Sequence, residues 1–121
     1  MFSTSWTTEC SGDSATWAEV CGDTTVVFEA GHGFASAVVL ADIAQVSQTV
    51  VHETTDLRLK ISQVAHPHDT TYVGFSSVRC PETIACAAPM LHGVVSNLTA
   101  GYHTATLEYK TASGTTFFRL G

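Results

Sequence analysis

Polar and apolar residues alternate with a period of two along most of the chain, and no apolar pattern reaches helical length. The clearest case is DLRLKI at residues 56–61, whose apolar side chains are predicted to face inward and whose charged ones are predicted to face water. TTVVFEA at 24–30 and YHTATLEYK at 102–110 follow the same rule. FASAVVLADI at 34–43 is too apolar for a strand with one wet face, so we expect both of its faces to be covered.

Turn-forming residues separate these strands at fairly even intervals. Glycines mark a turn in GHG at residues 31–33, and Pro67 excludes HPHDT at 66–70 from a central strand because proline lacks the amide hydrogen. Gly74 interrupts the next strand and indicates a bulge or a close approach of another backbone. The pattern predicts about eight to ten short strands without a βαβ crossover. We therefore expect an all-β, antiparallel jelly-roll sandwich that forms a single domain over residues 1–121.

The composition argues against two classes of partner. Only five of the 121 residues are Lys or Arg and the formal net charge is −6, so the chain lacks the basic surface that nucleic acid or an anionic membrane requires. No apolar run approaches the roughly 18 residues of a membrane-spanning helix. The opening MFSTSWTTEC lacks the basic region and apolar core of a signal peptide, so we expect either that the chain is used without Sec-dependent export or that its start has been trimmed.

The four cysteines form two pairs that are local in sequence. Cys10 and Cys21 bracket one short turn-like segment and Cys80 and Cys86 bracket another, so we predict a disulfide within each pair. Buried free thiols are the alternative, whereas a zinc site needs closer spacing than either pair has. Disulfides would place the mature protein in an oxidising, extracellular setting.

The hairpin NLTAGYHTATLEYKTASGTTFF at residues 97–118 combines an anchor, a chain reversal and a strand with one wet face. Leu98 is predicted to anchor in the core, Gly101 to reverse the chain in a left-handed conformation, and Gly114 to form the following turn. At the start of the strand, we expect His103 to be a hydrogen-bonded structural histidine rather than a catalytic or metal-binding one. NLT is also a formal N-glycosylation sequon, although turn chemistry explains the same residues.

The same hairpin carries L-x-A-G-x-H-T at residues 98–104, S-G-T at 113–115 and a closing Phe117–Phe118 pair. In this arrangement it resembles a jelly-roll module of tailed-bacteriophage head-decoration and tail-fibre proteins, which is related in pattern to C1q/TNF-like trimers. FSTSWTT near the start and LRLKI in mid-chain are similar to further parts of the module. The resemblance implies a trimeric structural protein of a virion surface. The four cysteines depart from the phage versions, and without Gly-x-y repeats the C1q-type context has no support.

Two neighbouring histidines raise the question of a metal site. His66, His68 and Asp69 would supply two imidazoles and a carboxylate, but the glycine and glutamate that flank such a pair in cupins are missing. The sequence also has no G-x-S-x-G elbow and no phosphate-binding glycine loop, and its glutamates are scattered. We therefore expect no enzyme activity, no metal and no cofactor.

Two functions from different classes remain. The first is a homotrimeric head-decoration (cement) protein or fibre tip on the virion surface, which would contact the major capsid protein or another virion protein. Its candidate subunit contacts are Phe34, Val38, Leu40, Phe117 and Phe118. The alternative is a secreted C1q/TNF-like or lectin-type module that recognises glycans or a receptor through loops 31–33, 66–70 and 80–89.

Overall fold

The described part of the chain is built of β-strands alone. The computed structural model describes residues 9–22, 24–31, 36–80 and 87–120, and within these ranges it contains ten strands and no helix. The strands are β1 (Glu9–Gly12), β2 (Ala18–Glu19), β3 (Val26–Ala30), β4 (Ser36–Asp42), β5 (Gln45–Gln48), β6 (Thr54–Gln63), β7 (Thr70–Arg79), β8 (Met90–Ser96), β9 (Gly101–Thr111) and β10 (Thr116–Arg119). Every pairing between them is antiparallel, which confirms the predicted all-β, antiparallel class.

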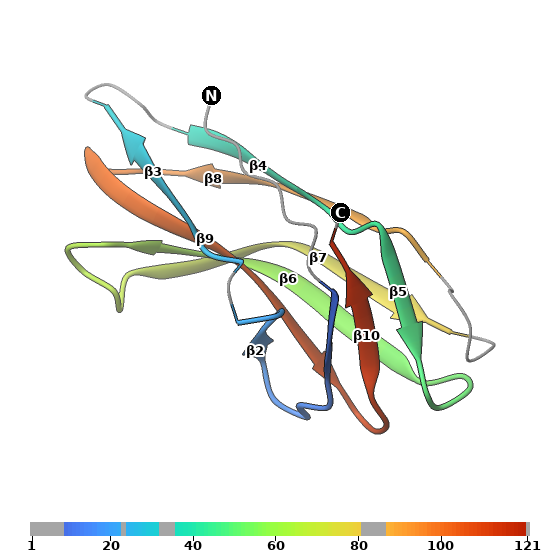
Figure 1. Cartoon of the computed structure of the whole chain (residues 1–121). Coiled ribbons are helices and arrows are strands. Elements are labelled where there is room, and N and C mark those ends of the chain that lie inside the picture. The colour runs from blue at the N-terminus through green and yellow to red at the C-terminus, as the bar shows by residue number, and fades with distance from the viewer. Residues whose placement is uncertain (1–8, 23, 32–35, 81–86, 121) are drawn as a thin grey trace.

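The longest strand, β9, organises the largest sheet. β6 pairs along one edge of β9, β2 and β3 pair one after the other along the opposite edge, and β7 continues the sheet beyond β6. The other strands form a three-stranded sheet in the order β1-β10-β5 and a two-stranded sheet of β4 and β8. A bridge between Val46 and Ala87 lies where these two smaller sheets approach each other. Because core residues of the large sheet pack against those of the smaller ones, the arrangement is sandwich-like (Figure 1).

The core lies between these layers. Leu57 of β6 and Leu107 of β9 contribute to it from the five-stranded sheet, while Leu91 of β8 and Phe118 of β10 contribute from the smaller sheets. The rings of Tyr109 and Phe118 meet edge to face with their centroids 5.1 Å apart. The alternation along β6 and β9 thus buries the apolar face that the sequence pattern predicts.

A polar network is buried among these apolar residues. The side chain of Gln48 is 1% exposed, and its amide nitrogen donates to the hydroxyls of Thr111 and Thr116, both at 3.0 Å. The hydroxyls of Thr55 and Thr116 lie 2.8 Å apart, and the Gln48 carbonyl oxygen accepts from the backbone N–H of Thr49 at 2.8 Å. The network therefore joins β5 and β10 of one layer to β6 and β9 of the other by hydrogen bonds.

Two glycines let β7 and β8 approach each other closely. Gly74 has a φ of +66°, and β7 forms a bulge there, because Leu57 pairs with Ser76 whereas Leu59 pairs with Val73. On β8, a Cβ added to Gly93 would lie 2.6 Å from the Val73 Cβ and 2.9 Å from the Gly74 nitrogen. Both alternatives predicted for Gly74, a bulge and a close backbone approach, are therefore present.

Three expectations from the sequence require correction. Residues 34–43 are not covered on both faces within the described chain, because Val38 and Leu40 of β4 are 68% and 63% exposed. Leu98 is only half-buried and is not part of the core. Phe118, a candidate subunit contact, is 2% exposed and belongs to the core, since it lies on the inward face of β10.

The buried network predicts different effects for two glutamines of the same strand. Gln48→Met should lower the free energy of unfolding by about 1–3 kcal/mol, because buried hydroxyls lose a hydrogen-bond partner. Gln45→Met should change it by less than about 0.5 kcal/mol, because this side chain lies on the outward face of β5. Urea denaturation followed by circular dichroism measures both values. Equal effects of the two substitutions would contradict a stabilising role for the network.

Candidate functional site

The predicted residues of the C-terminal hairpin lie in a structural setting. Gly101 has a φ of +125° and Gly114 a φ of +73°. Residues with a side chain adopt such positive φ values only at an energetic cost, whereas glycine does so readily. His103 is 4% exposed, and its Nε2–H donates to the carbonyl oxygen of Thr99 at 2.9 Å. Its ring stacks on Phe28 with a centroid distance of 5.6 Å. A histidine held in this way anchors the start of β9 to the preceding turn and to β3.

The cysteines stabilise the edges of the fold. Cys10 of β1 and Cys21, which follows β2, form a disulfide with a Cα–Cα distance of 5.5 Å, which confirms the predicted pairing. Cys80 also takes part in a disulfide. Its predicted partner, Cys86, lies outside the described residues, as does the candidate subunit contact Phe34.

The candidate metal ligands lie in the turn between β6 and β7. The rings of His66 and His68 are 6.1 Å apart, and the His68 Nε2 is 4.0 Å from the Asp69 carboxylate. The side chains of His68 and Asp69 are 82% and 65% exposed. Among the described residues, no group of three or more His, Cys, Asp and Glu side chains is arranged to hold a metal ion.

A charged and aromatic cluster covers the outward face of the five-stranded sheet. The Arg58 guanidinium carbon lies 4.0 Å from the ring centroid of Trp17 and 3.6 Å from that of Tyr72. Its Nε donates to the Glu108 carboxylate at 2.8 Å, and the Lys110 Nζ is 5.0 Å from the Trp17 ring. The guanidinium therefore occupies the space between the two rings that a cationic ligand would need.

This cluster corrects the prediction that Arg58 and Glu108 face water. Their side chains are only 13% and 11% exposed, because Trp17 and Tyr72 cover them. Strand alternation places both residues on the outward face but does not reveal that an aromatic residue from before β2 folds over them. The arrangement clamps the segment before β2 onto β6 and β7.

Two ionisable groups at the surface have shifted pKa values. A hydrogen bond from the Ser113 hydroxyl at 2.6 Å, followed by one from the Thr54 backbone N–H, lowers the pKa of Glu53. A hydrogen bond with the Glu29 carboxylate, together with its negative charge, raises the pKa of Tyr102. Both groups tie neighbouring strands or turns together, and neither lies beside another shifted group that would form an acid–base pair.

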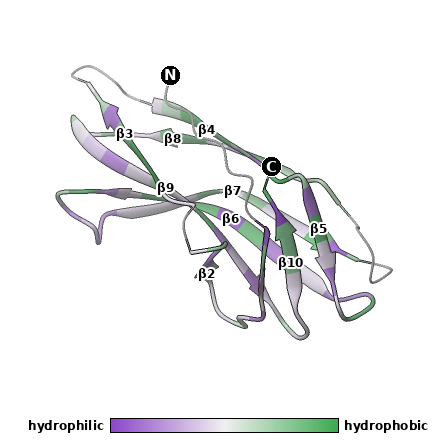
Figure 2. Cartoon of the chain, viewed as in Figure 1, coloured by the Kyte–Doolittle hydropathy of each residue, from purple (hydrophilic) through white to green (hydrophobic). Residues whose placement is uncertain are grey.

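Four exposed apolar side chains lie on the outward face of β4 and β8, where His92 pairs with Leu40 and Asp42 with Met90. These side chains are 58–68% exposed, and the pairing sets Val38 directly opposite Val94. Figure 2 shows the hydrophobic residues along β4. We refer to Val38, Leu40, Met90 and Val94 as the β4–β8 surface. Two of its residues were predicted from the sequence, whereas Met90 and Val94 were missed because the period-two pattern of residues 91–96 does not say which face is covered.

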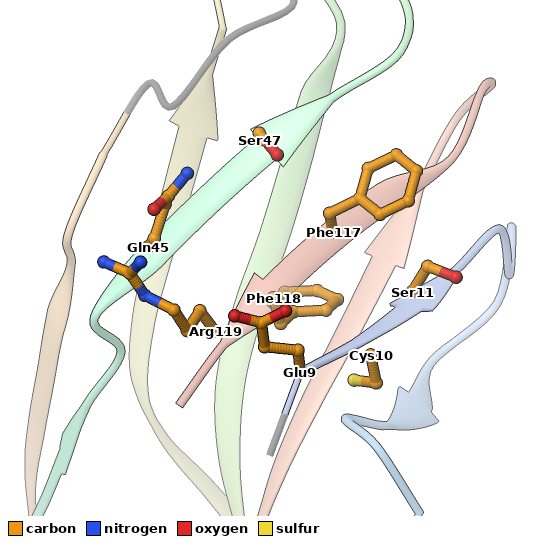
Figure 3. A pocket seen from close by; sticks show the side chains of 8 residues that line it. All are labelled: Glu9, Cys10, Ser11, Gln45, Ser47, Phe117, Phe118 and Arg119. Carbon is orange, nitrogen blue, oxygen red and sulfur yellow. The ribbon is translucent and has the colours of Figure 1, made fainter. Parts of the chain in front are cut away.

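A shallow depression of about 410 Å³ lies on the outward face of the three-stranded sheet. Figure 3 shows Phe117 at one end of it and the side chains of Glu9, Gln45 and Arg119 toward the other. Phe117 is 45% exposed, so this candidate subunit contact is at the surface. The remaining lining residues are Cys10, Ser11, Ser47 and Phe118.

Comparison of the chain with protein-family models, with curated proteins and with solved structures found no match. Within the described residues, no helix is long and apolar enough to cross a membrane. The function is therefore inferred from the surfaces described above.

The clamp around Arg58 predicts a large stability difference between two neighbours on β6. Arg58→Ala should lower the free energy of unfolding by about 3 kcal/mol, because it removes both ring contacts and leaves the Glu108 carboxylate covered and unpaired. Chemical denaturation followed by circular dichroism measures this value.

Lys60→Ala is the matched control, since Lys60 is also an outward residue of β6, and its effect should stay below about 0.5 kcal/mol. The double variant Arg58→Met with Glu108→Gln should recover part of the loss, because no unpaired charge remains. A loss for Arg58→Ala no larger than that of the control would show that the cluster does not act as a clamp.

Proposed function

We propose that this protein is a non-enzymatic structural protein of a virion surface, a homotrimeric head-decoration (cement) protein or fibre tip. The observation that carries the proposal is the β4–β8 surface. Monomeric proteins rarely expose large contiguous apolar patches, and such patches mark contacts between proteins. We assign this surface to contact with a second copy of the chain.

The strand order supports a jelly roll. If β4 and β5 are taken as one interrupted strand, and β2 and β3 as another, the layers become β1-β10-β4/5-β8 and β2/3-β9-β6-β7. In both layers, early and late strands of the chain alternate, as expected when a long hairpin is rolled into two four-stranded sheets. This order agrees with the module that the C-terminal hairpin resembles.

Exposed apolar residues beside the charged cluster on the other layer support a cyclic assembly. The outward face of the five-stranded sheet exposes Val27, Phe75 and Tyr102 at 55–65%. A threefold ring is heterologous, so each copy must offer two different surfaces, one for each neighbour. The β4–β8 surface and the outward face of the large sheet lie on opposite layers and provide such a pair.

The formal net charge of −6 and the small number of cationic groups suit a protein that binds other proteins of the particle rather than the phosphates of nucleic acid. Copies of the protein would then make many weak contacts with the repeating capsid lattice. Because they bind the assembled capsid and not its unfolded subunits, they would shift the unfolding equilibrium of the capsid toward the assembled state.

The assembly surface is tested by a substitution that introduces charge without disturbing the core. The native chain should sediment as a trimer, and Leu40→Glu should sediment as a monomer, because a carboxylate is buried without a partner on association. Sedimentation equilibrium over a hundredfold range of concentration measures the mass.

Val51→Glu is the control, because it changes the net charge equally at a 47% exposed position in the turn before β6. This variant should remain a trimer. A native chain that stays monomeric at the highest concentration contradicts the proposed trimer, and a trimeric Leu40→Glu variant contradicts the surface assigned to it.

The virion role is tested by adding the purified protein to expanded phage heads that lack their decoration protein. The protein should co-sediment with the heads and raise their melting temperature by several degrees, because it binds only the assembled lattice. Differential scanning calorimetry measures the shift. The measurement is repeated with heads from several tailed phages, and bovine serum albumin added to the same heads is the negative control. Failure of the protein to bind any of these heads would contradict the virion role.

A further inference from the structure

The depression on the three-stranded sheet is built from two rows of side chains that face outward. In the first row, Phe117 of β10 pairs with Ser11 of β1 on one side and with Ser47 of β5 on the other. Directly opposed residues of neighbouring strands have their Cβ atoms about 5 Å apart, so the cross-strand neighbours decide how much of an aromatic ring is covered. Serine side chains are too short to cover a phenyl ring, and Phe117 consequently remains 45% exposed on a central strand.

The second row lies two residues further along the strands. Arg119 of β10 pairs with Glu9 of β1 and with Gln45 of β5. The two rows are about 6–7 Å apart, because each residue of a strand advances the chain by about 3.3 Å. Figure 3 shows the carboxylate, guanidinium and amide groups gathered at the same end of the depression.

The polar groups of the second row are available to a ligand. In the part of the chain that the structure describes, the side chains of Glu9, Gln45 and Arg119 take part in no hydrogen bond and no ion pair. Together they offer carboxylate acceptors, a guanidinium with donors in a fixed plane, and an amide that both donates and accepts. The cross-strand neighbours Arg119 and Glu9 carry opposite charges, so the row has no net charge.

We propose that this depression binds a neutral hexopyranose unit of a glycan. The C–H bonds on one face of a pyranose ring carry partial positive charge and stack on the negative face of an aromatic ring, here Phe117. A pyranose ring and its hydroxyls span a distance similar to the separation of the two rows. The hydroxyls, which both donate and accept, then match the mixed donors and acceptors of Glu9, Gln45 and Arg119.

The charge of the site gives no preference for anionic sugars. A carboxylate or sulfate near Arg119 would also lie near Glu9, on a chain whose formal net charge is −6. Repulsion by Glu9 would then offset the attraction of Arg119. The site also differs from the loops 31–33, 66–70 and 80–89 that the sequence suggested for glycan contact, since it lies on a sheet face.

A peptide fits the same surface less well. β10 is paired on both sides, so a peptide strand could add only beyond β1, away from the rows centred on Phe117 and Arg119, and the depression is too open to enclose an apolar anchor residue. The proposal assigns Phe117 to the sugar rather than to a subunit contact, and it is independent of the trimer because no residue of the depression belongs to the β4–β8 surface or to the outward face of the large sheet. Its failure and the failure of the assembly are therefore distinguishable.

The experiment is a titration of the ¹⁵N-labelled chain with methyl glycosides of glucose, galactose, mannose, N-acetylglucosamine and fucose, followed by amide chemical shifts. At least one of these glycosides should bind saturably with a dissociation constant in the millimolar range. The shifted amides should belong to β1, β5 and β10. The methyl glycoside of glucuronic acid should bind no more tightly than that of glucose, because the charges of Arg119 and Glu9 offset each other.

Two variants locate the binding. Phe117→Ala and Arg119→Met should each weaken binding of the same glycoside at least tenfold, with circular dichroism spectra and melting temperatures close to those of the native chain. Val64→Ala is the control, because Val64 is an exposed apolar residue, 50% exposed, in the turn between β6 and β7 and on neither of the assembly surfaces, and this variant should bind as the native chain does.

Three outcomes would overturn the proposal. They are the absence of saturable binding by every glycoside, binding that Phe117→Ala leaves intact, and shifts confined to strands other than β1, β5 and β10. Saturable binding of the tripeptide Gly-Phe-Gly at this depression, with none of the glycosides, would assign the site to peptides and would also overturn it.

Discussion

The buried amide of Gln48 is the contact on which the arrangement of the two layers depends. It donates to hydroxyls on β9 and β10, while Thr55 of β6 completes the network through the hydroxyl of Thr116. Hydrogen bonds are directional, whereas apolar contacts tolerate sliding, so this network fixes how β5 and β10 are set against β6 and β9. Every outward side chain of the three-stranded sheet, including both rows of the depression, depends on that setting because successive residues alternate between the faces.

The sequence pattern predicts strands well wherever one face is buried and the other is wet. β6 and β9 follow this rule, and alternation identified the inward residues of 56–61 and 102–110 but not the buried Thr55 and Thr111 at the strand ends. The strand β5 was missed because its inward residue Gln48 is polar, as is the outward residue Ser47. Apolar and polar residues therefore do not alternate along β5. A buried amide becomes recognisable only when its hydroxyl partners are known, and Thr55, Thr111 and Thr116 are distant from it along the chain.

The opposite exception occurs on β4. Here the apolar residues Val38 and Leu40 are at the surface, and the prediction of two covered faces was wrong for the chain by itself. Hydrophobicity indicates that a residue is removed from water, but a single sequence does not say whether its own chain or another molecule covers it. The same ambiguity applies to the Phe117–Phe118 pair that closes the C-terminal hairpin. Phe117 is at the surface, whereas Phe118 beside it is buried.

The Cys10–Cys21 disulfide fixes the edge strand that forms one wall of the depression. Cys10 lies between Glu9 and Ser11 on β1, which among the described strands pairs only with β10. Cys21 follows Val20, whose backbone N–H donates to Leu107 of β9, so the bond ties the edge of one layer to the other layer. Closing a loop of this length removes about 3 kcal/mol of chain entropy from the unfolded state in the usual model. An edge strand of four residues has few contacts of its own, so the disulfide holds in place one wall of the depression. A disulfide of this kind persists in an oxidising, extracellular setting, with which both the proposed assembly and the proposed sugar site are compatible.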